Sequence, residues 1–298
     1  MKHTLGFFGL IRIQNCLIAF SAVIVGGFLQ TSVPEYADLF LFAIVAALIC
    51  GSGNALNDIL DIESDRINHP IRPLPSGLLT IRQASIIAVV FASGGMIISL
   101  FLAPPLQLIT LVVSALLVWY NVSLKKTPLY GNLLIAFLGA LTVLSGGVAS
   151  GESIALLPGS AFPALMAFML HFAREVIKDV QDLHGDQAAG GRTFPIISGA
   201  RPALRLAAVI LALLVVVSLA PLYLGWYGSW YTVLVIVGVD FPLLAALVRL
   251  RNELTARLLS NASRALKLAM IVGLIAVTAE RLPVLVLITL CELRIACY

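Results

Sequence analysis

Long apolar stretches recur along the whole chain, and they constrain its fold more than any other feature. Each is bounded by Pro, Gly or charged residues and approaches the roughly 20 residues that a helix needs to cross a bilayer. They predict nine spans, at residues 7–29, 38–60, 83–103, 105–121, 130–150, 160–180, 203–224, 229–248 and 265–282. Only 11% of the 298 residues are charged. We therefore expect an all-α, polytopic membrane protein.

The basic residues are distributed unevenly between the predicted loops. If the amino terminus is cytoplasmic, the loops after the second, fourth, sixth and eighth spans lie on that side and hold nearly all Lys and Arg. The opposite loops hold none, which is the positive-inside pattern. We therefore predict a multi-pass protein of the cell membrane with a cytoplasmic amino terminus. The net charge of +4 follows from this pattern, so we expect a lipid bilayer and no nucleic acid as partner.

Two acidic segments close the second and sixth predicted spans, and both place polar residues at offsets 0, 4, 7 and 11. On a period of 3.6 residues, these offsets form a single stripe along one helix face. The first acidic ladder is Asn54, Asp58, Asp61 and Asp65. The second acidic ladder is Glu175, Asp179, Asp182 and Asp186. The shared register suggests an internal duplication.

A bound divalent cation is the best explanation of the two ladders. Carboxylates three and four residues apart repel one another, and charges at membrane depth are costly unless they pair or line a cavity. A solvated cytoplasmic cap would explain acids in a loop but not the repeated register. Mg²⁺ is usually held by one or two carboxylates together with substrate phosphate oxygens. The sequence has no His/Cys cluster that would favour zinc.

The ladders therefore predict a Mg²⁺-diphosphate site, with two ions, one per ladder, facing a shared diphosphate. The catalytic candidates are the six aspartates of the ladders, and the metal ligands are Asn54, Asp58, Asp61, Asp65, Asp179, Asp182 and Asp186.

Basic residues at the same level would stabilise the diphosphate as a leaving group. The candidates are Arg72, Lys125, Lys126, Arg174 and Lys178. The positive-inside rule offers a second explanation for these charges. Arg72, Lys125 and Lys178 are preferred over Lys126.

These motifs resemble those of the UbiA-type intramembrane prenyltransferases. The likeness is carried by Asn57-Asp58-x-x-Asp61-x-x-x-Asp65 with the following Arg72-Pro-Leu-Pro-Ser-Gly77, and by Asp179-x-x-Asp182-x-x-x-Asp186. It covers roughly residues 8–280, including Arg12, Asn15 and the segment from Tyr120 to Asn132. The substrate-binding candidates are therefore Arg12, Asn15, Asn54, Arg72, Tyr120, Lys125, Arg174 and Lys178.

The resemblance implies nine transmembrane helices around a central cavity with a cytoplasmic cap. Two Mg²⁺ would bridge a polyprenyl diphosphate, whose chain would lie in an apolar tunnel open toward lipid. Ionisation would leave an allylic cation, which an acceptor nucleophile traps. A dry, closed cap would keep water from quenching that cation.

Among subfamilies, Arg174-Glu175-x-x-Lys178-Asp179 with Gly185-Asp186 most resembles the geranylgeranylglyceryl phosphate geranylgeranyltransferases. The implied donor is geranylgeranyl diphosphate, and the implied acceptor is the hydroxyl of a prenylated glycerol phosphate. Enzymes that prenylate quinone, tocopherol or chlorophyll precursors share much of both motifs, so an aromatic or tetrapyrrole acceptor is the alternative. The non-enzyme alternative, an ion or solute transporter, fits less well because transporter sites usually lie at the bilayer midplane.

The chain is expected to form one transmembrane domain over residues 1–282. A C-terminal tail at residues 283–298 receives no role.

Overall fold

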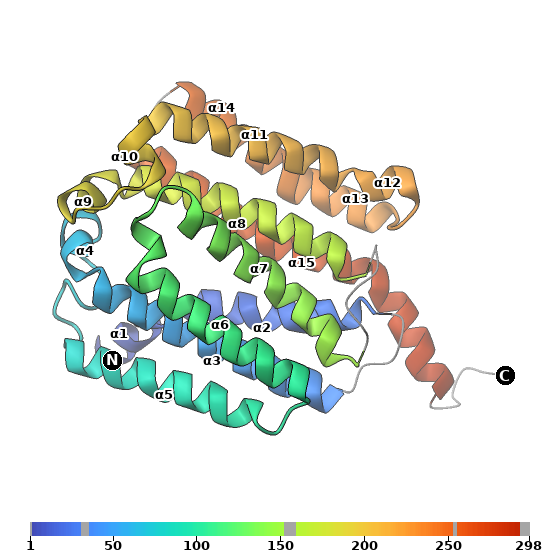
Figure 1. Ribbon diagram of the computed structural model, residues 1–298. Coiled ribbons are helices and arrows are strands. Elements are labelled where there is room, and N and C mark those ends of the chain that lie inside the picture. Colours follow the sequence, from blue (N-terminus) through green and yellow to red (C-terminus); the bar gives the residue numbers. More distant parts are fainter. Residues whose placement is uncertain (1, 31–35, 152–158, 253–254, 293–298) are drawn as a thin grey trace.

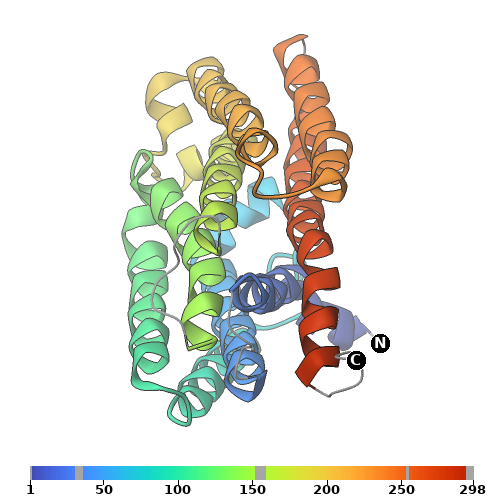
Figure 2. The same cartoon turned by 90° about the vertical axis from the view of Figure 1, so that its right-hand side faces the viewer.

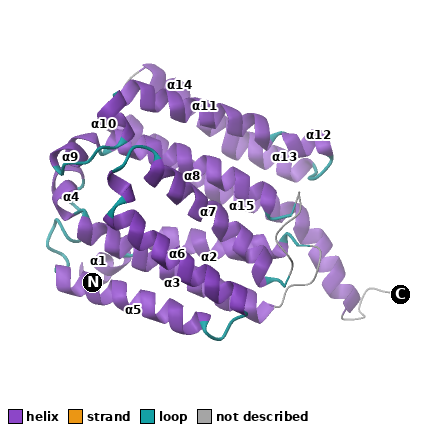
Figure 3. Cartoon of the chain, viewed as in Figure 1, coloured by secondary structure: helices purple, strands orange, loops and turns teal. Residues whose placement is uncertain are grey.

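The computed structural model describes residues 2–30, 36–151, 159–252 and 255–292. Within these ranges every regular element is a helix (Figure 3), which confirms the all-α prediction for the described part of the chain. The helices pack side by side in an elongated bundle (Figure 1).

The longer helices follow the predicted apolar stretches. They are α1 (Lys2–Leu10), α2 (Ile13–Phe28), α3 (Tyr36–Leu60), α5 (Ile81–Ser99), α6 (Pro104–Val122), α7 (Tyr130–Ala149), α8 (Ala161–Gln181), α11 (Ala200–Ser218), α14 (Phe241–Asn252) and α15 (Ala256–Glu292). Shorter helices connect them, namely α4 (Ile62–Asn68), η1 (Leu124–Lys126), α9 (Leu183–Ala188), α10 (Phe194–Ser198), α12 (Ala220–Leu224), α13 (Ser229–Val235) and the π-helix η2 (Ile236–Asp240).

Among the described residues, seven segments are long and apolar enough to cross a membrane, or eight if the bent pair of α1 and α2 counts as one span. This pair bends by 52° at Arg12, whose φ of 49° lies in the left-handed region. The predicted span 160–180 corresponds to α8, which is not among the seven because Arg174, Glu175, Lys178 and Asp179 lie in its last turns. The protein is therefore a polytopic membrane protein by helix length and composition.

The outer faces of the bundle carry apolar side chains, as expected where lipid is the solvent. Val89 and Val90 on α5 and Leu108 and Leu111 on α6 are all more than half exposed. An apolar surface of this extent is unusual for a soluble monomer but suits the hydrocarbon core of a bilayer.

The two largest apolar cores of the described residues lie in different groups of helices. Ile177 of α8, Leu211 of α11, Val235 of α13 and Leu266 of α15 share one apolar core. Val23 of α2 and Phe42 of α3 belong to a second core, to which α6 and α7 also contribute. The helix α2 lies inside the bundle, where it packs against α3, α7 and α15 (Figure 2).

One end of the bundle is covered by short elements. The helices α4, α9 and α10 gather at this end, on the left in Figure 1, and α4 packs against α9. Both acidic ladders lead to this end, because α3 and α8 precede α4 and α9 in the chain. At the other side of the molecule, α15 continues to Glu292, so the predicted tail begins inside this helix. No function is assigned to this tail.

The closest contact between α2 and α7 is made by glycines. A Cβ added to Gly26 would lie 1.9 Å from the backbone oxygen of Val143, and one added to Gly146 would lie 2.0 Å from that of Val23. These atoms belong to helix backbones, which cannot move aside as the end of a flexible side chain can. Small residues are thus required where the two helices cross.

We predict that Gly26→Ala destabilises the fold by about 2 kcal/mol or more, since overpacking against a backbone cannot be relieved locally. Thermal unfolding of the detergent-solubilised protein measures the effect. Gly94→Ala is the matched control, because a Cβ there meets only Leu48 Cδ1 at 3.7 Å. Equal midpoints for the two variants would contradict the assignment of Gly26 to a tight crossing.

Candidate active site

Both acidic ladders are interrupted at the same position. The helix α3 ends at Leu60 and α4 begins at Ile62, while α8 ends at Gln181 and α9 begins at Leu183. The residues between them have nearly the same backbone, with φ −97° and ψ 6° at Asp61 and φ −93° and ψ 4° at Asp182. The predicted single stripe on one continuous helix is therefore wrong beyond these aspartates. Asp is a weak helix former, and the break turns α4 and α9 across the end of the bundle.

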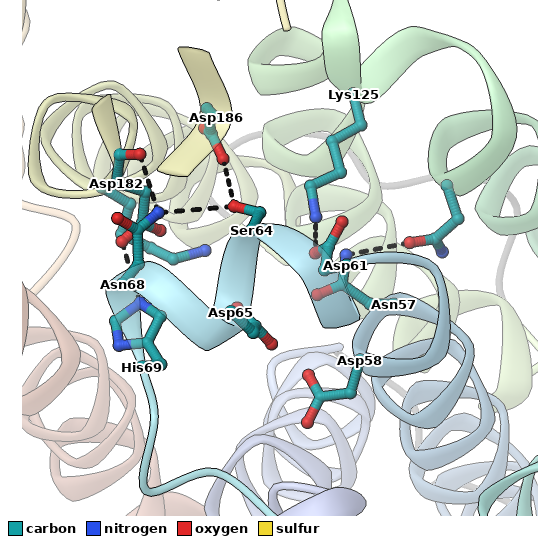
Figure 4. A network of polar contacts seen from close by, with 12 residues as sticks. Asn57, Asp58, Asp61, Ser64, Asp65, Asn68, His69, Lys125, Asp182 and Asp186 are labelled. Atoms are coloured by element: carbon teal, nitrogen blue, oxygen red, sulfur yellow. Dashed lines mark hydrogen bonds and ion pairs between the residues drawn. The ribbon is translucent and has the colours of Figure 1, made fainter. Parts of the chain in front are cut away.

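The aspartates of the first ladder are held by cations. Arg12 Nη2 donates to Asp58 Oδ1 at 2.5 Å, and Arg72 Nη1 donates to both oxygens of Asp65 at 2.6 Å. Lys125 forms an ion pair with Asp61. Figure 4 shows Asp58 and Asp65 on the same side of α4, where Arg72 Nη1 also lies 3.8 Å from Asp58 Oδ1. Three predicted substrate-binding residues thus contact the three aspartates directly.

The aspartates of the second ladder have different direct partners. Asn132 Nδ2 donates to Asp179 Oδ2 at 2.9 Å, and Ser64 Oγ donates to Asp186 Oδ1 at 2.8 Å. His69 Nε2 lies 2.8 Å from Asp182 Oδ1. None of these partners carries the fixed positive charge of Arg or Lys. The two ladders therefore match in position but differ in how far the protein itself neutralises them.

Glu175, the first member of the second ladder, is held by two cations. Arg174 Nη1 donates to its Oε1 at 2.9 Å, and Lys178 Nζ donates to its Oε2 at 2.9 Å. In the first ladder the corresponding residue, Asn54, donates instead to the backbone oxygen of Ile11 at 3.0 Å, beside the bend between α1 and α2. The first positions of the two ladders therefore differ in their partners as well as in residue type.

Asn68 joins the short helices α4 and α9. Its Nδ2 donates to the backbone oxygen of Asp182 at 2.8 Å, and its Oδ1 accepts from the Gly185 backbone N–H at 3.0 Å. A Cβ on Gly185 would lie 2.3 Å from Asn68 Nδ2, so only glycine fits there. Figure 4 shows this network, in which contacts from α4 reach both Asp182 and Asp186.

Burial disfavours the ionised form of the carboxylates outside the membrane spans, and their direct partners oppose this effect to different degrees. It raises the pKa of Asp65, although Arg72 opposes the change, and it raises the pKa of Asp186 despite the hydrogen bond from Ser64. At Asp182 burial acts in the same sense, but the contact with His69 outweighs it and lowers the pKa. A bound cation would favour the ionised form of each of these groups.

The described residues contain no group of three or more His, Cys, Asp or Glu side chains that could hold a metal ion by itself. The ladders thus offer oxygen ligands without a closed cage. This donor set fits Mg²⁺, which prefers oxygen and completes its shell with substrate phosphates and water.

A cavity of about 240 Å³ lies inside the bundle, and we call it the central cavity. One part of its wall is polar and includes the predicted binding residues Arg12, Asn15, Asn54, Tyr120, Arg174 and Lys178, together with Glu175. The remainder is mostly apolar, with Ile18, Phe42, Val45 and Leu138 among the lining residues. The six aspartates, Arg72 and Lys125 do not line it; they lie in the network under α4 and α9.

Several residues of this site escaped the sequence analysis. Asn68 and His69 stand beside the Arg72 motif, and Asn132 ends a segment that was singled out, so the motifs contained them without indicating their partners. His171 lines the central cavity one turn before Glu175 on the same face of α8. Lys267 lines it from α15, where a lone Lys in a predicted span was a signal of function.

Comparison with known proteins agrees with this geometry. The model of the UbiA prenyltransferase family matches residues 19–271. The chain belongs to the UbiA prenyltransferase family. The predicted resemblance is thereby confirmed, and the UbiA protein described here is a prenyltransferase.

Individual UbiA relatives match over almost the whole length. The digeranylgeranylglyceryl phosphate synthase of Saccharolobus solfataricus is 33% identical over 276 residues, which are 92% of this chain and 96% of the relative. A solved digeranylgeranylglyceryl phosphate synthase shares 30% identity with a TM-score of 0.67, covering 94% of this chain and 99% of that chain. A UbiA homologue from Archaeoglobus fulgidus bound to GPP and Mg²⁺ shares the fold, with 17% identity, a TM-score of 0.65 and coverage of 92% and 99%.

We predict that Asn68→Ala loosens α9 from α4, because it removes both hydrogen bonds that Asn68 makes to the chain around Asp182. Backbone amides of residues 183–188 should exchange with deuterium roughly tenfold faster. Gln187→Ala provides the control, since Gln187 is an exposed residue of the same helix. If both variants exchange at the wild-type rate, Asn68 does not hold the two short helices together.

Proposed function

We propose that this UbiA protein transfers a geranylgeranyl group from its diphosphate to the free hydroxyl of geranylgeranylglyceryl phosphate, forming an ether. The central cavity carries this proposal. It joins several cations and the carboxylate of Glu175 at one end to apolar walls beyond, as an amphiphilic diphosphate requires. The 33% identity with a named digeranylgeranylglyceryl phosphate synthase supports this acceptor over an aromatic or tetrapyrrole one.

The proposed arrangement in the membrane has nine passes. In it, α8 is a span in spite of its charges, because those charges lie in its last turns. Arg174, Glu175 and Lys178 line the central cavity, and Asp179 accepts a hydrogen bond from Asn132 of α7. The bent pair of α1 and α2 is another span. The basic residues near α4, η1 and α9 favour a cytoplasmic position for this end and for the amino terminus, in the cell membrane.

Labelling of single cysteines tests the orientation. In a cysteine-free background, Ser76→Cys near α4 should react with a membrane-impermeant maleimide only from the cytoplasmic face. Ser229→Cys at the start of α13 should react only from the opposite face. Both serines are exposed, so access of the reagent is not limited by burial. Labelling of both positions from one face would overturn the proposed orientation.

The two ladders are the proposed ligands of two Mg²⁺. Asp58, Asp61 and Asp65, with Asn54, would serve one ion, and Asp179, Asp182 and Asp186 the other. When bound, the ions neutralise the charge that develops on the diphosphate leaving group. Support comes from the GPP and Mg²⁺ in the Archaeoglobus fulgidus homologue. The second ladder, without a direct Arg or Lys partner on its aspartates, has the greater need of a cation.

The protein's own residues bind and orient the diphosphate. In the ligand-free chain, Arg12, Arg72 and Lys125 neutralise the first ladder. Once cations occupy the ladders, these three side chains are available to the diphosphate oxygens, where positive charge favours cleavage of the C1–O bond. The acceptor hydroxyl then forms the new C1–O ether bond and gives its proton to the released diphosphate, while the apolar walls exclude water from the allylic cation.

Product analysis with purified protein in lipid nanodiscs tests the function. Geranylgeranyl diphosphate and geranylgeranylglyceryl phosphate should give a diether phosphate and inorganic diphosphate, dependent on Mg²⁺ and abolished by a chelator. An acceptor panel that includes 4-hydroxybenzoate and chlorophyllide is measured by mass spectrometry in parallel. A prenylated aromatic or tetrapyrrole product without the diether would sink the proposed acceptor, and solute uptake without diphosphate release would sink the enzyme itself.

Substitutions in the ladders test the metal assignment. Asp61→Asn and Asp182→Asn should each lower kcat by roughly 100-fold, because each removes one charged ligand while preserving the side-chain shape. Mn²⁺ counted by electron paramagnetic resonance in the presence of donor should fall from two ions to one per chain. Asp38→Asn, at the opposite end of α3, is the matched control and should change neither value. Unchanged Mn²⁺ stoichiometry in both ladder variants would contradict the two-ion site.

A further inference from the structure

A second cavity adjoins the central one. It has a volume of about 70 Å³, lies between α8, α13, η2 and α15, and is lined almost wholly by apolar side chains. We call it the second chamber. The two cavities share five lining residues, Ile18, Ala22, Gly139, His171 and Met270, so they meet at a common wall. A Cβ on Gly139 would lie 2.3 Å from the His171 ring, which places this ring tightly at the junction.

Two packed helices, α8 and α15, run past this junction. Along both, the residues that line the cavities follow the same order from charged to apolar. On α8, Arg174 lines the central cavity, His171 lines both, and Leu170 lines only the second chamber. On α15, Lys267 lines the central cavity, Met270 lines both, and Gly273 lines only the second chamber. Each helix therefore passes from a cation to apolar residues in the same direction. This is the profile of a site for an amphiphile with an anionic head.

We call the space along α8 and α15, from Arg174 and Lys267 to Leu170 and Gly273, the trough. The cations at its polar end have few carboxylate partners within the protein. Arg174 and Lys178 share the single carboxylate Glu175, and the buried Nε of Arg174 has no hydrogen-bond partner among the described residues. In the part of the chain that the structure describes, Lys267 contacts the neutral Gln14 at 3.0 Å and no carboxylate. This corner of the central cavity thus holds a surplus of positive charge, which the protein's own Arg and Lys side chains supply.

We propose that the trough between α8 and α15 is the acceptor subsite: Arg174 and Lys267 bind the acceptor's phosphate, and the second chamber takes the isoprenoid chain next to the glycerol. The inference rests on the proposed function, since it assigns the place of that function's acceptor. The donor chain then lies in the apolar part of the central cavity, toward α3 and α6. The small volume of the second chamber suits the first isoprene units, and the remaining chain continues toward lipid.

This arrangement places the reacting atoms together. In a glycerol that carries one phosphate and one ether, the free hydroxyl is at most two carbons from the phosphate-bearing carbon. A phosphate on Arg174 and Lys267 therefore holds the hydroxyl near the wall that both cavities share. The donor's C1, which follows directly on its diphosphate, approaches the same wall from the central cavity. Holding the two substrates in this way contributes to the rate by orientation.

Lys267→Gln tests the head of the subsite. The KM for geranylgeranylglyceryl phosphate should rise roughly tenfold, as expected from the loss of a charge-assisted hydrogen bond, while the KM for geranylgeranyl diphosphate stays within about twofold of wild type. Arg264→Gln removes the same charge one turn earlier on α15, at an exposed position, and should change neither value.

Gly273→Leu tests the chamber independently. A Cβ on Gly273 meets nothing within 4 Å, so the first atom of a larger side chain is accommodated at this position of the chamber wall. The KM for the acceptor should again rise about tenfold, with little change in the KM for the donor. Gly94→Leu on α5, which lines neither cavity, is the control for a larger residue in a membrane helix. The two variants alter opposite ends of the proposed subsite. If one of them does not fold, the other still tests the proposal.

The outcomes separate the inference from the function on which it rests. If wild-type protein forms no ether from the two substrates, the proposed function fails. If wild type forms the ether but Lys267→Gln and Gly273→Leu match their controls, the acceptor subsite is wrong. A rise in the KM for the donor alone would likewise overturn it, because the trough would then hold the donor.

Discussion

Neutralisation of carboxylates at one end of an apolar bundle is the constraint on which this structure depends. Six aspartates and a glutamate lie where water is scarce, and the chain must supply a partner for each. It does so in two ways, with Arg and Lys on the first ladder and with amide, hydroxyl or imidazole groups on the second. The unequal solution leaves the aspartates of the second ladder without a direct Arg or Lys partner, and this is the ladder that has more need of a cation in the proposed function.

The same requirement shapes the end of the bundle. Breaks at Asp61 and Asp182 turn α4 and α9 toward each other, and Asn68, Ser64 and His69 then link the two halves. Away from this end, glycine contacts draw α2 against α7, while the space among α2, α3, α6, α7, α8 and α15 stays open as the central cavity. Polar contacts thus close one end, and apolar packing leaves room beneath it.

Much of this architecture follows from local patterns in the sequence. Apolar stretches located the long helices, and the positions of the acids at the ends of the second and sixth predicted spans placed both ladders at one end. These properties depend on local hydrophobicity and on the number of spans alone. The breaks at Asp61 and Asp182 could not be read in this way, since a stripe at helical spacing looks the same whether or not the helix bends. Partners such as Asn132 and Ser64 lie 47 and 122 residues away from Asp179 and Asp186, and no local pattern encodes such pairs. The sequence shows Lys267 as a charge in an apolar stretch, but it does not show that this side chain lines a cavity.

The bend at Arg12 shows what such a site requires of the backbone. Its φ of 49° is a conformation that glycine or asparagine adopts more readily, whereas for other residues it costs on the order of 1 kcal/mol or more. The same turn directs the guanidinium toward Asn57 and Asp58. Selection for stability alone would therefore favour a different residue at this position. The arginine therefore combines local backbone strain with a charge beside Asp58, so the first break in the chain lowers folding stability where it neutralises a buried carboxylate.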